Sequence, residues 1–198
     1  RGGEFAPELS MVGKETRAGV LSHEPVERES PLRITLLQGV ARGERMDLIV
    51  QKATELGVAR IVPVLTLRSV VKLDARQSAR KLEHWQAVVV AACEQCGRNR
   101  IPEVATPVPL GDALPALPPG ESRCLLAADA EPSLTRAVEG NGSVVLLIGP
   151  EGGLADDERK FARACGFESY RIGPRILRTE TAGLAAIATL QAAAGDFA

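Results

Sequence analysis

Short apolar runs alternate with helix-like stripes along most of the chain. The segments 33–38, 60–66, 123–128, 143–148 and 168–172 are rich in leucine and β-branched residues, a pattern typical of strands. Between them, apolar residues recur every three or four positions, which is typical of amphipathic helices. Strands and helices that alternate in this way predict an α/β domain with a mainly parallel sheet, covered by helices on both faces.

Glycines mark the ends of the predicted helices. A helix is expected to end near Gly57, and a long helix over 78–96 is expected to end at Gly97. Pro63 interrupts the second predicted strand and argues for an edge position or a local irregularity there. A proline-rich stretch, 106–122, is expected to be a connector. The apolar stripe of the first helix comprises Met46, Ile49, Val50, Ala53 and Leu56. Further helices are predicted at 133–138, 156–165 and 181–194.

The length and composition favour one complete domain. The chain has 198 residues, of which 45% are hydrophobic, enough for one full-sized core but short for two. Because the first 30 residues hold few apolar side chains, we expect residues 1–30 to be the remnant of an incomplete N-terminal unit and 31–198 to be the main domain. No apolar run is long enough to span a bilayer, and the start does not resemble a signal peptide. Four cysteines without extracellular features favour a reduced cytoplasm.

Charge is uneven along the chain. The formal net charge is −1, so the molecule as a whole does not attract nucleic acid electrostatically. Between Arg60 and Lys81, however, Asp74 is the one acid among several bases. This basic stretch is either a phosphate-facing surface or a solvated helix face.

A glycine-rich loop follows the predicted strand 143–148, with the sequence Gly149, Pro150, Glu151, Gly152, Gly153. Ligands bind outside the carboxyl ends of parallel strands, and glycines let a ligand approach the main chain closely. The loop lacks the Gly-Lys-Ser/Thr of a Walker motif and does not match GxGxxG. On this loop alone, a plain tight turn and a ligand site remain open.

A second loop of similar design follows the strand 168–172. Here Gly173 and Pro174 precede a cluster of charged residues and threonines that leads into an apolar helix. Thr179 or Thr181 could cap that helix, and Glu180 would suit its positive end. Two such loops after neighbouring strands favour a two-walled pocket over two unrelated turns.

Other polar motifs have structural explanations beside the functional ones. Cys93 and Cys96 have the spacing of half a metal site, but no second pair exists, so a small apolar pair on a buried helix stripe is favoured. Arg98 could satisfy helix carbonyls or reach a phosphate, and both alternatives remain open. Lys52 and Glu55 are expected to pair on the polar side of the first helix.

Four motifs in order carry a resemblance to a known family. The segments QKATELGV, EQCGR, IGPEGG and ILRTETA resemble the RsmE family of 16S ribosomal RNA uridine methyltransferases, in the SPOUT superfamily, over about residues 32–194. The resemblance implies methyl transfer from S-adenosylmethionine to N3 of one uridine of 16S RNA in the small ribosomal subunit. It also implies a SPOUT-type mainly parallel sheet with a C-terminal trefoil knot, a homodimer without metal, and a partial PUA-like β-barrel remnant in residues 1–30.

The same resemblance assigns site residues. Its cofactor positions correspond to Gly149, Pro150, Glu151, Gly152, Gly153, Ile172, Gly173, Ile176, Leu177, Arg178, Thr179 and Glu180. Ile176 and Leu177 are expected to flank the adenine. One departure is Ala155, which replaces the Ser or Thr that usually caps the next helix in the family. We therefore expect Asp156 to take over the cap.

A catalytic hypothesis follows from the ionisable groups of the two loops. Arg178 is expected to stabilise negative charge on the uracil carbonyl, and Glu180 or Glu151 to accept the N3 proton. RNA phosphates are expected to contact Arg68, Lys72 and Arg98. The competing hypotheses are methylation of another RNA nucleotide, a non-catalytic ribosome-binding module, and a nucleotide-binding enzyme that uses the loop at 149–153 for phosphate.

Overall fold

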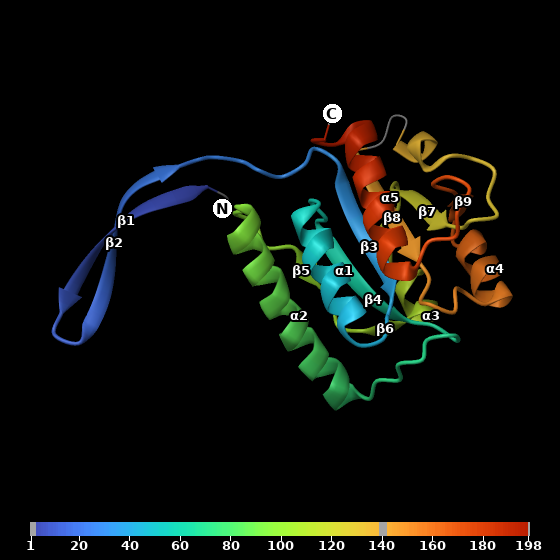
Figure 1. Ribbon diagram of the computed structural model, residues 1–198, viewed down its shortest axis with the longest axis horizontal. Helices are drawn as coiled ribbons and strands as arrows, with labels where there is room; N and C mark the ends of the chain where they lie inside the picture. Colours follow the sequence, from blue (N-terminus) through green and yellow to red (C-terminus); the bar gives the residue numbers. More distant parts are fainter. Residues whose placement is uncertain (1–2, 139–141, 198) are drawn as a thin grey trace.

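The central feature of the computed structural model, which describes residues 3–138 and 142–197, is a twisted parallel sheet (Figure 1). Its strands lie in the order β5-β4-β3-β8-β7-β9, with β6 beside β4. Every strand pair in this sheet is parallel, as the alternating pattern predicts. The strands are β3 (Arg33–Gly39), β4 (Arg60–Leu65), β5 (Glu103–Val104), β6 (Val108–Pro109), β7 (Ser122–Leu126), β8 (Ser143–Ile148) and β9 (Glu168–Tyr170).

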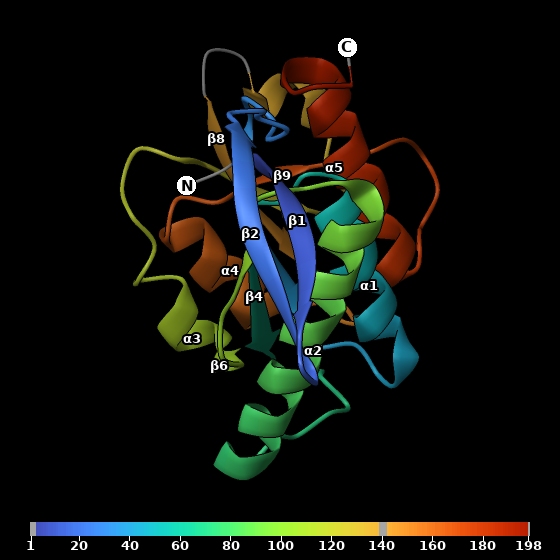
Figure 2. The same ribbon diagram turned by 90° about the vertical axis from the view of Figure 1, so that its left-hand side faces the viewer.

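Helices cover both faces of the sheet (Figure 2). One face packs against α1 (Glu44–Glu55), α2 (Ala75–Cys96), α5 (Thr179–Ala194) and the 3₁₀ helix η1 (Leu134–Val138). The other face packs against α3 (Leu110–Ala113) and α4 (Asp156–Ala164). Successive residues of a strand point to opposite faces, so Leu36 and Leu146 belong to the first core and Leu37 and Leu147 to the second. All four are fully buried.

Both caps predicted for the ends of the pocket helices are wrong. Arg178 is the N-cap of α5, without a side-chain cap bond, and Thr179 lies inside the helix. The N-cap of α4 is Ala155, and it is Glu158, not Asp156, whose carboxylate accepts the Ala155 N–H at 2.8 Å. Glu158 also accepts the Leu67 N–H at 2.8 Å, so one carboxylate satisfies backbone donors of two segments.

The local irregularity predicted at Pro63 is present. Pro63 lies opposite the gap between β5 and β6, which pair with the same side of β4. β5 pairs with residues 60 and 61 of β4, whereas β6 pairs with residues 64 and 65. Because proline has no N–H to donate, the strand on that side is interrupted at Pro63. On its other side β4 pairs continuously with β3.

The proline-rich stretch is more ordered than a connector. It contains β6 and α3, and it buries Leu110 and Leu114 in the second core. Composition concealed this order because prolines at 107, 109, 115, 118 and 119 are compatible with loops and with short elements alike.

An antiparallel hairpin precedes the domain. It consists of β1 (Glu4–Val12) and β2 (Glu15–Glu24), and all of its strand residues are exposed. The hairpin stands clear of the α/β body (Figure 1) and is joined to β3 by a linker, residues 25–32. Six large apolar side chains of the hairpin are at least half exposed, namely Phe5, Leu9, Met11, Val12, Val20 and Leu21.

Candidate active site

A cavity of about 650 Å³ opens at the carboxyl ends of the central strands. Its walls come from the end of β7, from the loop after β8 and from the segment between β9 and α5. All twelve cofactor residues expected from the sequence line this one cavity. The complete lining comprises residues 125–129, 148–154, 172, 173, 175–180 and 182, together with Arg45, Arg68 and Arg159.

The first wall, residues 149–153, is a tight turn seated on the neighbouring strand. The Gly153 N–H donates to the Pro150 carbonyl at 2.8 Å, and Gly153 has a φ of 66°. A Cβ added to Gly39 at the end of β3 would lie 2.5 Å from the Pro150 nitrogen, so only glycine fits there. The end of β3 therefore lies directly against the backbone of this wall. The same wall also lines the cavity.

The second wall, residues 172–180, is joined to the first by a buried hydroxyl. Thr179 donates to the Gly149 carbonyl at 2.6 Å and accepts from the Gln38 side-chain amide at 3.0 Å. Gln38 is fully buried in β3 and also donates to the Gly39 carbonyl at 3.0 Å. Thr179 is thus a crosslink between β3, the loop after β8 and the start of α5, which explains why it does not act as a cap.

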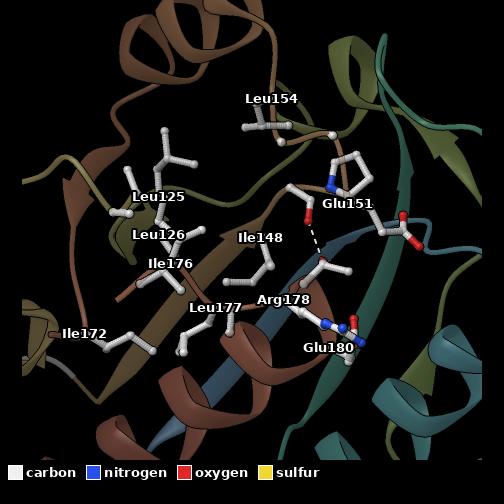
Figure 3. Close-up of a pocket in the computed structure, with 18 of the residues that line it drawn as sticks. Leu125, Leu126, Ile148, Glu151, Leu154, Ile172, Ile176, Leu177, Arg178 and Glu180 are labelled. Atoms are coloured by element: carbon white, nitrogen blue, oxygen red, sulfur yellow. Dashed lines mark hydrogen bonds between the residues drawn. The ribbon is translucent and has the colours of Figure 1, made fainter. Parts of the chain in front are cut away.

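The cavity has an apolar end and a charged end. Leu125, Leu126, Ile148, Ile172 and Leu177 gather at the apolar end, whereas Glu151, Arg178 and Glu180 lie at the other (Figure 3). Ile176 belongs to the apolar group and is 89% exposed. Such an arrangement suits a ligand with an apolar ring system and a charged part.

Glu151 is held by two donors. The Arg42 N–H and the Arg45 guanidinium Nη1 each donate to its Oε1 at 2.9 Å. Burial by itself would raise the pKa of Glu151, but the hydrogen bonds from the Arg42 and Glu151 amides and from Arg45 outweigh it and hold that pKa below its ordinary value. Glu151 is therefore an anion at neutral pH.

Glu180 and Arg178 are less engaged than Glu151. The Glu180 Oε1 lies 3.8 Å from the Arg45 Nε, while its Oε2 is buried and has no hydrogen-bond partner in the described chain. Arg178 is exposed at the rim, and no hydrogen bond or ion pair joins its side chain to the rest of residues 3–138 and 142–197. The Arg178 guanidinium is therefore available to a ligand, whereas the Glu180 Oε2 is unpaired among the described residues but buried.

The basic residues expected to bind RNA are not brought together. Arg68 lines the cavity, and its Nη1 donates to the Gly152 carbonyl at 3.2 Å. Lys72 lies on the loop between β4 and α2, outside the cavity. Arg98 does not fit the expectation that it contacts RNA phosphates. Its side chain is 6% exposed, pairs with Glu29, and donates to the carbonyls of Thr54 and Val58 at 2.7 and 3.0 Å. Its guanidinium is occupied by the protein.

Sequence reasoning missed one wall of the cavity, the Arg159 that pairs with it, and Arg45. Residues 125–129 line the cavity because β7 lies next to β8, and strand order cannot be seen in a single sequence. Asp129 there accepts from Arg159 at 2.7 and 2.8 Å, and this hydrogen bond lowers its pKa. The other omission is Arg45, whose place at the start of the first predicted helix, after β3, was the signal that could have found it.

All four cysteines are free thiols. Cys93 is buried on α2 as its apolar stripe predicts, and burial raises its pKa. Burial also raises the pKa of Cys124 to about 12. Within the described residues, no group of three or more His, Cys, Asp or Glu side chains is arranged to hold a metal ion. Nor do those residues include a helix long and apolar enough to cross a membrane.

Comparison with known proteins agrees with this fold. The model of the family described as "RNA methyltransferase domain" matches residues 28–191, which defines the class of the protein. A ribosomal RNA small subunit methyltransferase E from Buchnera aphidicola is 35% identical over 98% of this chain and 79% of its own, and one from Bacillus subtilis is 31% identical over 96% and 77%. The chain belongs to the ribosomal RNA small subunit methyltransferase E family.

Solved structures of similar proteins contain a cofactor. The crystal structure of a ribosomal RNA small subunit methyltransferase E from Neisseria gonorrhoeae, bound to S-adenosyl methionine, has a TM-score of 0.93 and 39% identity, and covers 100% of this chain and 82% of its own. A putative methyltransferase from Legionella pneumophila, in complex with the same cofactor, has a TM-score of 0.92 and 40% identity, with coverage of 98% and 81%.

Proposed function

We propose that this protein transfers a methyl group from S-adenosylmethionine to N3 of a uridine in the 16S RNA of the small ribosomal subunit. The observation that carries the proposal is the cavity in which the two glycine-proline loops meet. Its volume of about 650 Å³ is in the range of small-molecule sites, and its apolar and charged ends match a nucleoside joined to an amino acid. The names and the bound cofactor of the relatives support the same assignment.

The residues of the cavity fit the cofactor. Ile176 and Leu177 would flank the adenine, and the backbone of residues 149–153 would supply amides and carbonyls to it. When bound, S-adenosylmethionine supplies an activated methyl group, so the task of the protein is to align the acceptor and to exclude water. Alignment of this kind contributes roughly 7 to 11 kcal/mol in well-oriented reactions.

The acceptor must lose a proton from N3. Arg178, exposed at the rim, is the residue that would stabilise negative charge on the uracil carbonyl. Of the two carboxylates expected to take the proton, Glu180 is favoured over Glu151. The Glu180 Oε2 has no partner among the described residues, whereas Glu151 already accepts two hydrogen bonds and has a lowered pKa, which makes it the weaker base.

The finer features implied by the family resemblance belong to the same proposal. We infer a trefoil knot near the C-terminus from the family resemblance, and the hydrogen bond from Thr179 to Gly149 joins the two segments that would take part in it. The exposed antiparallel hairpin is consistent with the remnant of a PUA-like barrel over residues 1–30, before a methyltransferase domain over 31–198. A cytoplasmic homodimer that works without a metal completes the proposal.

RNA phosphates are proposed to approach the charged rim of the cavity. Arg68 and Lys72 lie on the loop that borders this rim, while Arg98 is withdrawn from the set because it is buried. The target base would be presented unpaired, since its N3–H is otherwise engaged in base pairing.

The decisive experiment uses small subunits from a strain that lacks this modification. They are incubated with the protein and labelled S-adenosylmethionine, and the 16S RNA is then mapped by mass spectrometry. We expect one added methyl group on N3 of a single uridine. A methyl group on another nucleotide would correct the assignment of the substrate, whereas cofactor binding without product would indicate a non-catalytic binding module.

A further inference from the structure

Arg45 stands at the point where the two walls of the cavity come closest to α1. The chain leaves β3 through residues 40–43, turns at Gly43 with a φ of 62°, and begins α1 at Glu44. Arg45 therefore projects from the first turn of α1 at the carboxyl end of the sheet, where it lines the cavity. None of the motifs singled out in the sequence includes this residue.

One guanidinium contacts a carboxylate from each wall. The Arg45 Nη1 lies 2.9 Å from the Glu151 Oε1, and the Nε lies 3.8 Å from the Glu180 Oε1. The side chains of Glu151 and Glu180 are 27% and 14% exposed, against 46% for Arg45. Among the ion pairs of the described residues, Arg45 is the cation that these two acids share.

Two partly buried carboxylates at one end of a cavity repel each other and lose hydration, which favours protonation or outward rotation. A shared cation offsets both effects. Because Arg45 and the Arg42 N–H use the same oxygen of Glu151, that side chain is fixed from two directions and attaches the 149–153 loop to α1. The more distant Glu180 is oriented through its Oε1, and its buried Oε2 has no hydrogen-bond partner among the described residues.

We propose that Arg45 is a positioning residue of this site: through Glu151 it sets the geometry of the cofactor loop, and through Glu180 it aims the carboxylate that receives the substrate proton. This inference rests on the proposed methyl transfer. The Arg45 side chain would then have two separate effects, one on cofactor binding through Glu151 and one on the chemical step through Glu180.

These effects on cofactor binding and on methyl transfer are tested separately with the variants Arg45→Gln, Glu151→Gln and Glu180→Gln. Cofactor affinity is measured by calorimetry with S-adenosylmethionine, and the rate of methyl transfer is measured in single turnovers on small subunits at saturating cofactor. We expect Arg45→Gln to weaken binding about tenfold and to slow transfer about tenfold, as the loss of a charge-assisted hydrogen bond implies. Glu151→Gln should reproduce the first loss, and Glu180→Gln chiefly the second.

A double-mutant cycle distinguishes positioning from a general loss of structure. Arg45→Gln combined with Glu151→Gln should bind the cofactor no more weakly than the worse single variant, within about twofold, because both remove the same ion pair. Arg45→Lys should recover part of the affinity through its remaining charge. Arg136→Gln, the same exchange at an exposed position of η1 outside the cavity, is the matched control and should behave as the unaltered protein.

The inference is overturned if Arg45→Gln keeps both affinity and rate within twofold, or if the losses in the double variant multiply. These outcomes are distinct from failure of the proposed function. If the unaltered protein does not bind S-adenosylmethionine, the proposed function fails. If it binds and methylates while Arg45→Gln does the same, only the role of Arg45 is refuted.

Discussion

Arg178 and Glu180 are two positions apart in the chain, yet their surroundings differ. Arg178 is exposed and precedes α5 as its N-cap, while the Glu180 carboxylate turns toward Arg45. Thr179 between them is fixed by hydrogen bonds to Gln38 and Gly149. Because Thr179 is fixed, the backbone positions of the two residues beside it are fixed as well.

At this scale Arg178→Ala tests the catalytic assignment. We expect the single-turnover rate to fall by about 10² or more, because a donor to a developing negative charge is removed, with cofactor affinity changed less than about threefold. The measurement pairs calorimetry with rapid-quench methylation. Arg171→Ala, in the same segment but outside the cavity, is the control. Normal turnover with only cofactor affinity reduced would show that Arg178 serves binding alone.

The role of a residue could be predicted from the sequence where its neighbours along the chain determine that role. The two glycine-proline loops were found because the sequence carries both the preceding strands and the turns. Arg98 and Thr179 were misassigned because their partners are distant: Arg98 reaches Glu29 and Thr54, and Thr179 reaches Gly149. A single sequence contains no information about such pairings.

At the scale of elements, the turn after α2 holds the linker that leads to the hairpin. Gly97 ends α2 with a φ of 77°, and the residues after it bind to the linker. Arg98 pairs with Glu29, the Asn99 amide donates to the Val26 carbonyl at 2.7 Å, and Arg100 pairs with Glu27 at 2.5 Å. The motif EQCGR thus leads into an anchor for the linker.

Loosening this anchor should expose the linker to protease. Asn99→Ala removes the bond to Val26 and about 1 kcal/mol of local stability, so cleavage by trypsin after Arg28 should become roughly fivefold faster. Mass spectrometry of timed digests measures the rate. Gln86→Ala, on the exposed face of α2, is the control. An unchanged cleavage rate in Asn99→Ala would mean that the linker is protected by other interactions.

The elements themselves were predictable where burial decides them. β8 occupies 143–148 as predicted, because a strand buried on both faces reads as a continuous apolar run. The short elements β6 and α3 were not predicted, since two or four residues carry no periodicity. Their order comes from packing against β4 and the second core, which lies outside the local sequence.

For the whole molecule, the net charge is near neutral, yet the loop between β4 and α2 carries Arg68, which lines the cavity, and Lys72, which lies outside it. Charge reversal at Arg68 and Lys72 should weaken binding to small-subunit RNA and reduce the slope of log affinity against log salt by about one for each phosphate that is no longer neutralised. Affinity is measured over a series of salt concentrations. Lys160→Glu with Arg163→Glu, on α4 outside the cavity, is the control. An unchanged slope would remove this loop from the RNA-binding surface.

The close contact between Pro150 and Gly39 limits how this site can be redesigned. Backbone meets backbone at that junction, so there is no side chain to trim or exchange when a bulkier cofactor analogue is to be accommodated. The outer wall offers more freedom, since Gly173, Arg175 and Ile176 are all open to solvent. Laboratory evolution toward analogues of the methyl donor should therefore accumulate its changes in the segment before α5 and leave the central strands untouched.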